Sequence, residues 1–223
     1  HPLIVSVRAA GIFTMPGILQ TTVNVGMNDE VAKRMVEQTG NPWFVYDTYR
    51  RFIKNYATNV FGIPEEQFMP VIEEVKKRAG VPLKEELSGR HMKEVVEIYK
   101  SIVVDEGFGR ELRDALQDPY AALMNVIRAA KKDWDSDTTK AYTSKMNIAR
   151  DWNVAIIVQQ MVFGNRINTT GNAANDSLTV VCHSREYNTF RISPKGEIKF
   201  NAQGDDIVSG ETGMRGIKPL AYL

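Results

Sequence analysis

The sequence predicts an α+β fold in which strand-forming stretches near both ends of the chain flank a long helical middle. β-Branched residues punctuated by glycine occupy residues 3–27, helical apolar periodicity runs through residues 28–134, and strand-like stretches return within residues 135–223. Because runs of strands separated from a run of helices are typical of α+β proteins, we expect residues 1–27 and 135–223 to form one mixed-sheet domain. Residues 28–134 are then a helical insertion in that domain.

The first segment is expected to hold two strands. Residues 3–7 (LIVSV) form an apolar run typical of a buried strand, and residues 19–26 supply a second strand. Met15, Pro16 and Gly17 predict the turn between them. Because a core strand begins almost at the first residue, we expect the chain to be a piece of a longer protein.

Helix signals dominate the middle segment. Asn28 is expected to cap a helix that stops at Gly40, and Pro42 is expected to begin a second helix that runs to Phe61. Further helices are predicted at residues 71–78, 92–104 and 112–132. Their apolar side chains recur at helical spacing, which favours packing in a core over a cofactor site.

Strands are predicted again in the last segment, after a short helix at residues 139–150. The strongest strand pattern covers residues 154–163, and a polar loop follows at residues 164–176. Three further strands are then predicted, of which the last two are joined by a hairpin turn. They cover residues 178–182, 189–192 and 197–201, with the turn at residues 193–196.

The composition excludes several classes of function. The chain has 28 lysines and arginines and 27 aspartates and glutamates, which gives a net charge of +1. This charge is too small to favour binding to nucleic acid. A single cysteine, Cys182, excludes an intramolecular disulfide and a multi-cysteine metal site. No apolar run reaches the roughly 20 residues of a membrane span. We therefore expect a soluble, cytoplasmic protein that binds neither nucleic acid nor membrane.

Three polar clusters beside strands are candidates for chemistry. Arg8 follows a buried strand and could bind an anion there. Gly17 could let backbone N–H groups approach the same anion. A guanidinium suits phosphate oxygens, but a surface arginine or one paired with a carboxylate fits the pattern as well. Asp47 lies three and four residues before Arg50 and Arg51, which is typical of an exposed helix ion pair.

The third cluster and a separate acidic pair follow later strands and leave alternatives open. The loop at residues 164–171 holds an arginine, hydroxyls and glycines, which suit either polyphosphate binding or an ordinary loop. Asp205 and Asp206 could hold Mg²⁺ together, or they could belong to a turn. The common nucleotide-binding and hydrolase motifs are absent from the sequence.

Several of these motifs together resemble one family, the pyruvate, phosphate dikinases. The resemblance is to their nucleotide-binding domain, keeps the order and approximate spacing of the motifs, and runs over nearly the whole chain. The motifs cover residues 6–8, 14–17, 24–30, 46–53, 159–165, 168–171 and 201–210. A phosphoenolpyruvate synthase is the near alternative, but residues 161–165 and 201–204 favour the dikinase.

The resemblance implies an ATP-grasp-like mixed sheet interrupted by the helical insertion. It also implies that ATP, with Mg²⁺, and inorganic phosphate are used to phosphorylate a histidine on another domain of the parent protein. That phosphohistidine then converts pyruvate to phosphoenolpyruvate at a pyruvate-binding domain. The implied cofactors are thus ATP and Mg²⁺, and the implied partners are phosphate and those two domains.

The resemblance also implies roles for individual residues. Arg8 matches an arginine on the ATP phosphates, Gly17 falls in the glycine loop, and Arg51, Thr169 and Thr170 match the phosphate site. Arg8 and Arg51 are the implied catalytic residues, all five bind the nucleotide, and no metal ligand is assigned. Physically, arginines on the β- and γ-phosphates stabilise charge in a transfer that depends mostly on positioning and electrostatics.

The chain also departs from the family pattern. Ala9 and Ala10 replace a serine and a glycine, Asp205 replaces a glutamate, and a Phe-Thr-Arg-Asn-Pro strand is missing. The family's ATP-binding lysine, its Asp-x-Glu metal ligands and its acceptor histidine fall outside the chain, so we expect the chain alone to be inactive. The alternative is a non-catalytic binding or regulatory relative that keeps the scaffold.

Overall fold

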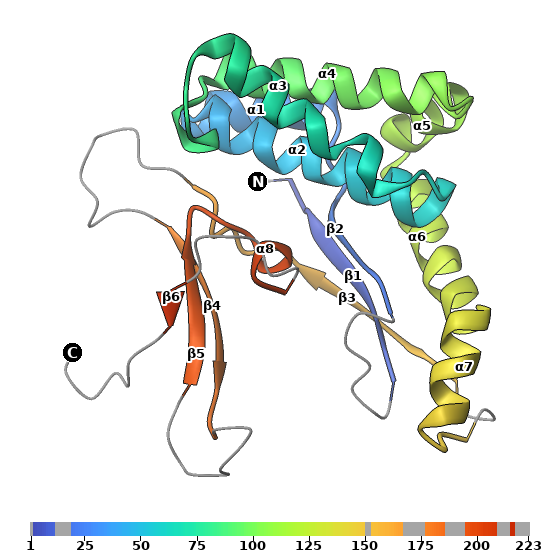
Figure 1. Ribbon diagram of the computed structural model, residues 1–223. Helices are drawn as coiled ribbons and strands as arrows, with labels where there is room; N and C mark the ends of the chain where they lie inside the picture. The colour runs from blue at the N-terminus through green and yellow to red at the C-terminus, as the bar shows by residue number, and fades with distance from the viewer. Residues whose placement is uncertain are drawn as a thin grey trace. The chain divides into compact units, whose positions relative to one another are not determined.

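The computed structural model describes residues 2–11, 19–149, 153–166, 177–185, 195–208 and 215–216. The chain divides into two compact units, residues 1–161 and residues 162–223. Helices and antiparallel strands both occur, as Figure 1 shows, and this confirms the predicted α+β class. No helix in the described part of the chain is long and apolar enough to cross a membrane.

The first unit contains a three-stranded antiparallel sheet in the order β2-β1-β3. Its strands are β1 (Val5–Ala10), β2 (Thr21–Val25) and β3 (Ala155–Gln160). β1 pairs along its full length with β3, so strands from both sides of the helical middle share one sheet. The sheet therefore joins the two ends of the first unit.

Helices fill the chain between β2 and β3. The α-helices are α1 (Asp29–Thr39), α2 (Pro42–Tyr56), α3 (Met69–Ala79), α4 (Gly89–Asp105), α5 (Gly109–Gln117), α6 (Pro119–Trp134) and α7 (Asp137–Lys145). Short turns of other helix types are η1 (Ala57–Phe61, a π-helix), η2 (Glu65–Gln67) and η3 (Lys84–Glu86), both 3₁₀. The predicted helical character of the middle segment is thus confirmed.

The predicted caps of the first two helices are confirmed. The Val31 N–H donates to Asn28 Oδ1 at 2.8 Å, which satisfies one of the unpaired amides of the α1 N-terminus. α1 ends at Gly40, whose φ of 62° is the left-handed conformation that glycine adopts without a steric penalty. Pro42 occupies the first turn of α2, as its sequence position indicates.

The single helix predicted at residues 112–132 is wrong, because the structure has two helices there. Asp118 has an extended ψ of 95° and separates α5 from α6. Its Oδ1 accepts the N–H groups of Tyr120 and Ala121, both at 3.0 Å, and so caps α6. Pro119 also disfavours a helical conformation at the residue before it. The Asp-Pro pair therefore ends one helix and starts the next.

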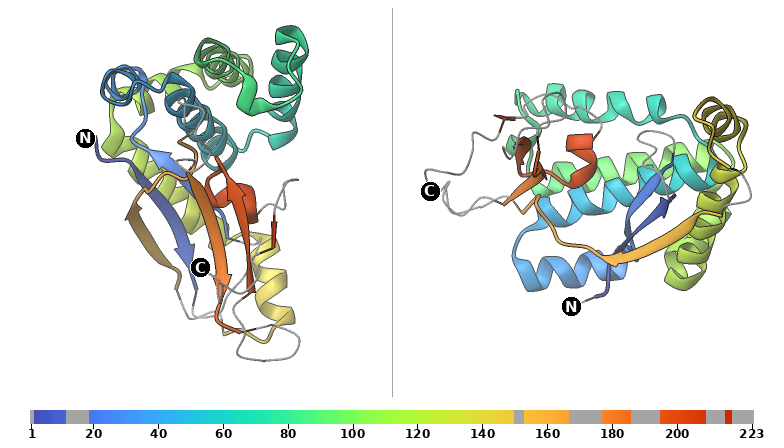
Figure 2. Two further views of the ribbon diagram at one scale, coloured as in Figure 1. Left: turned by 90° about the vertical axis from the view of Figure 1, so that its left-hand side faces the viewer. Right: turned by 90° about the horizontal axis from the view of Figure 1, so that it is seen from below.

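Helix α2 lies between α4 and the sheet, an arrangement visible in Figure 1 and in the turned views of Figure 2. This position explains why polar as well as apolar side chains of α2 are buried. Its largest fully buried side chains are Phe44, Tyr49, Phe52, Ile53 and Tyr56. Burying one such side chain stabilises the fold by roughly 1.5–3 kcal/mol. The packing of α2 against α4 therefore contributes much of the stability of this core.

The second unit contains a small antiparallel sheet in the order β4-β5-β6. Its elements are β4 (Leu178–His183), β5 (Lys195–Phe200), α8 (Gly204–Val208) and β6 (Arg215–Gly216). The strand predicted at residues 189–192 lies outside the described residues. The turn predicted at 193–196 is corrected in its second half, because Lys195 and Gly196 pair with β4 as part of β5.

Candidate functional site

Arg8 lies on the exposed side of β1. The preceding residue, Val7, is 1% exposed, and successive strand side chains point to opposite faces, so Arg8 faces away from the core. Its cross-strand neighbours are Thr21 on β2 and Ile157 on β3. Within the described ranges, no hydrogen bond or ion pair engages Arg8. An exposed guanidinium on a rigid strand is thus open to an anion.

Arg51 lies in a buried charge cluster on α2, which corrects the expectation of an exposed helix pair. Asp47 Oδ2 accepts the Arg51 Nε–H at 3.0 Å, and Asp47 Oδ1 accepts the Nε–H of Arg50 at 2.9 Å. Asp47 is fully buried, while Arg50 and Arg51 are 6% and 2% exposed. The packing of α2 against the sheet and α4 causes this burial, which i,i+4 spacing does not reveal.

Three predicted site residues lie outside the described residues. They are Gly17, Thr169 and Thr170. Arg8 and Arg51 are described, but they occupy different surroundings, one exposed on a strand and one buried in a helix. A common phosphate site for the five residues therefore stays a prediction.

In the second unit, hydrogen bonds join two of the motifs that carry the family resemblance. The Gln203 side chain donates from Nε2 to Asn165 Oδ1 at 3.1 Å, and the Ala202 N–H donates to Gly164 O at 3.1 Å. Asn165 and Gln203 are 0% and 2% exposed. The segments after β3 and after β5 are thus held together by buried polar contacts.

The acidic pair after β5 belongs to a helix start. Asp206 is 3% exposed, and its Oδ2 accepts the backbone N–H of Gln203 at 2.8 Å, in the manner of a capping residue. Across the described ranges, no group of three or more His, Cys, Asp or Glu side chains could hold a metal ion. The role of Asp205 and Asp206 in holding Mg²⁺ therefore stays a prediction.

Sequence patterns missed two polar side chains on the same face of α2 as Arg51. Asn55 follows Arg51 by four residues, and Thr58 follows it by seven, at the π-helical turn η1. Asn55 Nδ2 and Thr58 Oγ1 are buried atoms without a hydrogen-bond partner. The i, i+4, i+7 spacing was the signal that could have found them.

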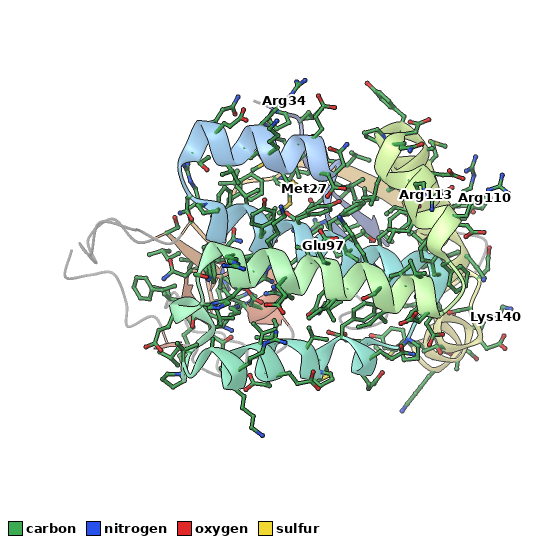
Figure 3. The ribbon with its side chains drawn as sticks, turned by 90° about the horizontal axis from the view of Figure 1, so that it is seen from above. Met27, Arg34, Glu97, Arg110, Arg113 and Lys140 are labelled. Carbon is green, nitrogen blue, oxygen red and sulfur yellow. The ribbon has the colours of Figure 1, made fainter. Side chains whose placement is uncertain are left out.

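A groove of about 500 Å³ lies in the first unit, where α1 begins beside α4 and α5. Figure 3 shows Arg113 on its α5 side, next to Arg110, which does not line it. Lys100 at the groove donates to Asp29 Oδ1 at 2.7 Å and is therefore already paired. Neither of the two described site residues, Arg8 and Arg51, lines this groove.

Tyr49 should make the protein sensitive to alkali. Burial, followed by the charge of Asp29, raises the pKa of Tyr49 well above its ordinary value, whereas an unfolded chain titrates near the usual value of about 10. The pKa of Tyr49 is higher in the folded protein than in the unfolded chain. Uncharged Tyr49 therefore stabilises the fold fully below about pH 10, and this stabilisation is lost as the pH rises further. We therefore expect Tyr49→Phe to reduce the loss of stability above about pH 10 in urea titrations. Tyr120→Phe, at a side chain 81% exposed, should leave the pH dependence unchanged.

No protein-family model matches the chain, but curated relatives match it over nearly its whole length. A pyruvate, phosphate dikinase of Clostridium symbiosum is 36% identical over 222 residues, covering 100% of this chain and 24% of the relative. The pyruvate, phosphate dikinase 1, chloroplastic, of Arabidopsis thaliana is 36% identical over 209 residues, covering 94% and 20%. That of Rickettsia typhi is 32% identical over 210 residues, covering 94% and 22%.

These relatives are kinases, a class of transferase. The chain is a homologue of the pyruvate, phosphate dikinases, which confirms the predicted resemblance. It spans between 20% and 24% of the length of these relatives, so it corresponds to one segment of them.

Proposed function

We propose that the chain is the nucleotide-binding part of a phosphotransferase of the pyruvate, phosphate dikinase type. In this proposal it has an ATP-grasp-like fold and binds ATP, with Mg²⁺ carried by the nucleotide, together with inorganic phosphate. The phosphoryl group goes to a histidine on another domain of the parent protein, and from there to pyruvate at a further domain. We place this activity in the cytoplasm, although the Arabidopsis relative is named as chloroplastic.

The observation that carries the proposal is the exposed, unengaged guanidinium of Arg8. A strand paired on both sides holds it rigidly, and its five N–H donors match phosphate oxygens two at a time. Phosphoryl transfer needs cationic groups fixed in position before the charge develops, and β1 provides such a platform. Arg8 would bind the phosphates of the nucleotide.

Arg51 supports the proposal in a different way. Its guanidinium is oriented by Asp47 through Nε, and its side chain is 3% exposed. A phosphate therefore reaches Arg51 only after the side chains that cover it move. We propose that nucleotide binding is coupled to this local rearrangement, so that Arg51 meets a phosphate in the bound state alone.

The test is thermal unfolding with and without Mg·ATP. Ligand at 100 times its Kd stabilises a protein by about 2.7 kcal/mol, which is readily measured as a rise in Tm. We expect this rise in the unmodified chain, and we expect Arg8→Ala to lose it. Arg128→Ala should keep it, since Arg128 is none of the predicted phosphate ligands and its side chain donates to Asn125 on the same helix, α6.

Two outcomes would count against this reading. Equal protection of the unmodified chain and of Arg8→Ala would remove Arg8 from the site. If Mg·ATP protects neither protein, the same test is made on the parent protein, because the family's ATP-binding lysine and metal ligands fall outside this chain; a lack of protection there favours the scaffold relative without nucleotide binding. The replacements at Ala9, Ala10 and Asp205 would then mark the loss of the site.

A further inference from the structure

Arg51, Asn55 and Thr58 form a polar stripe along α2 and into the π-helical turn η1. Residues spaced i, i+4 and i+7 lie on one face of a helix, and at 1.5 Å per residue this stripe is roughly 10 Å long. Asp47, one turn earlier, fixes the Arg51 guanidinium at the start of the stripe. One charged donor and two neutral polar groups thus follow one another along a single helix face.

Two atoms of this stripe have no partner. Asn55 Nδ2 and Thr58 Oγ1 are inaccessible to solvent, yet neither makes a hydrogen bond in the part of the chain that the structure describes. Buried polar atoms are paired in the great majority of cases, and an unpaired one calls for a missing water, ion or ligand. The stripe also enters a π-helical turn, a feature that is frequent at functional sites.

Asn59, in the same turn, shows the opposite behaviour. Its Nδ2 donates to Thr22 Oγ1 at 2.8 Å and to Thr21 O at 3.3 Å, which ties η1 to β2. Thr21 in turn is the cross-strand neighbour of Arg8. Two neighbouring asparagines thus differ: the fold uses Asn59 in η1, whereas it leaves Nδ2 of Asn55, at the end of α2, without a partner.

We propose that Asn55 and Thr58 are donors to phosphate oxygens of the nucleotide, in a subsite that continues from Arg51. This rests on the proposed function, because the ligand is the same polyphosphate. Both residues are half-buried, and in this proposal their side chains rotate to present the amide N–H and the hydroxyl to the ligand. Phosphate oxygens accept from both groups, and the nearby guanidinium supplies the charge.

The test combines affinity with stability in Asn55→Leu and Thr58→Val, which keep the side-chain size and remove the polar atom. Calorimetric titration with inorganic pyrophosphate and with Mg·ATP should show roughly tenfold weaker binding for each variant, as expected for a lost hydrogen bond to a charged group. Without ligand, Tm should stay the same or rise, because an unpaired buried group is replaced by an apolar one. Thr58→Ser, which keeps the hydroxyl, should restore the affinity.

Asn59→Leu is the matched control. It removes two hydrogen bonds of the fold, so Tm should fall by roughly 2–4 °C or more while the affinity for pyrophosphate stays the same. The proposal is overturned if Asn55→Leu and Thr58→Val behave as this control does, since the two atoms would then serve the fold through a buried water. It is also overturned if both variants bind pyrophosphate as tightly as the unmodified chain.

The two ligands separate this inference from the proposed function. If Mg·ATP and pyrophosphate bind but Asn55→Leu and Thr58→Val do not weaken the binding, the nucleotide function stands and the subsite fails. If pyrophosphate binds, Asn55→Leu and Thr58→Val weaken its binding, and Mg·ATP does not bind, the subsite stands as an anion site and the nucleotide function fails. If neither ligand binds the unmodified chain, the subsite is wrong, and the nucleotide function is then judged in the parent protein.

Discussion

Replacing Asp47 with asparagine is expected to lower the free energy of unfolding by about 3–5 kcal/mol. Asp47 is fully buried and accepts hydrogen bonds from both Arg50 and Arg51, which are themselves almost fully buried. Asparagine keeps the shape but removes the negative charge and places an amide where an acceptor is needed. Two buried guanidinium groups then lose the carboxylate that they share, which is far more costly than losing a surface pair.

Urea unfolding at neutral pH measures this change through the shift in midpoint. Glu73→Gln is the control, because Glu73 forms a similar i,i+3 pair with Lys76 on α3 but is 70% exposed. Its free energy of unfolding should change by no more than about 0.5 kcal/mol. A similar small effect for both variants would show that the Asp47 cluster is not essential to the stability of the helical core.

Local features of the fold were predictable from sequence because their signals are local. Asn28, Gly40 and Pro42 mark helix ends through conformational preferences that act within one turn of the chain. Asp118 and Pro119 carry a signal of the same kind, and the break between α5 and α6 was missed because the apolar periodicity was followed across it. That periodicity persists because both helices turn an apolar side to the core.

The candidate site was less predictable because its properties come from packing between distant segments. The spacing of Asp47, Arg50 and Arg51 is the same in an exposed helix and in a buried one, and only the contact of α2 with β2 and α4 decides between them. Likewise, the sequence places Asp205 and Asp206 after a strand, a position that is typical of a turn or of a metal site. Their helical conformation depends on Gln203, which is held from the distant Asn165.

Gly164→Ala is expected to destabilise the second unit by about 3 kcal/mol, an effect at the upper end for overpacked sites. A Cβ atom on Gly164 would lie 2.1 Å from Thr179 Oγ1, 2.6 Å from Ala202 O and 3.0 Å from Leu178 O. Two of these are backbone oxygens of segments that are themselves hydrogen-bonded, so they cannot rotate away as a flexible side chain does. The Thr179 hydroxyl is also fixed, because it donates to Ala202 O at 2.6 Å.

The expected damage is local and can be followed by amide hydrogen exchange. The Ala202 N–H donates to Gly164 O at 3.1 Å, so displacement of either segment should speed the exchange of this amide and lower Tm. Gly204→Ala is the matched control, since nothing lies within 4 Å of a Cβ there and alanine suits the start of α8. It should leave exchange at Ala202 unchanged. Equal exchange rates in the two variants would mean that the Gly164 and Ala202 segments are not closely packed, and that the buried link between the two motifs is not what holds the second unit together.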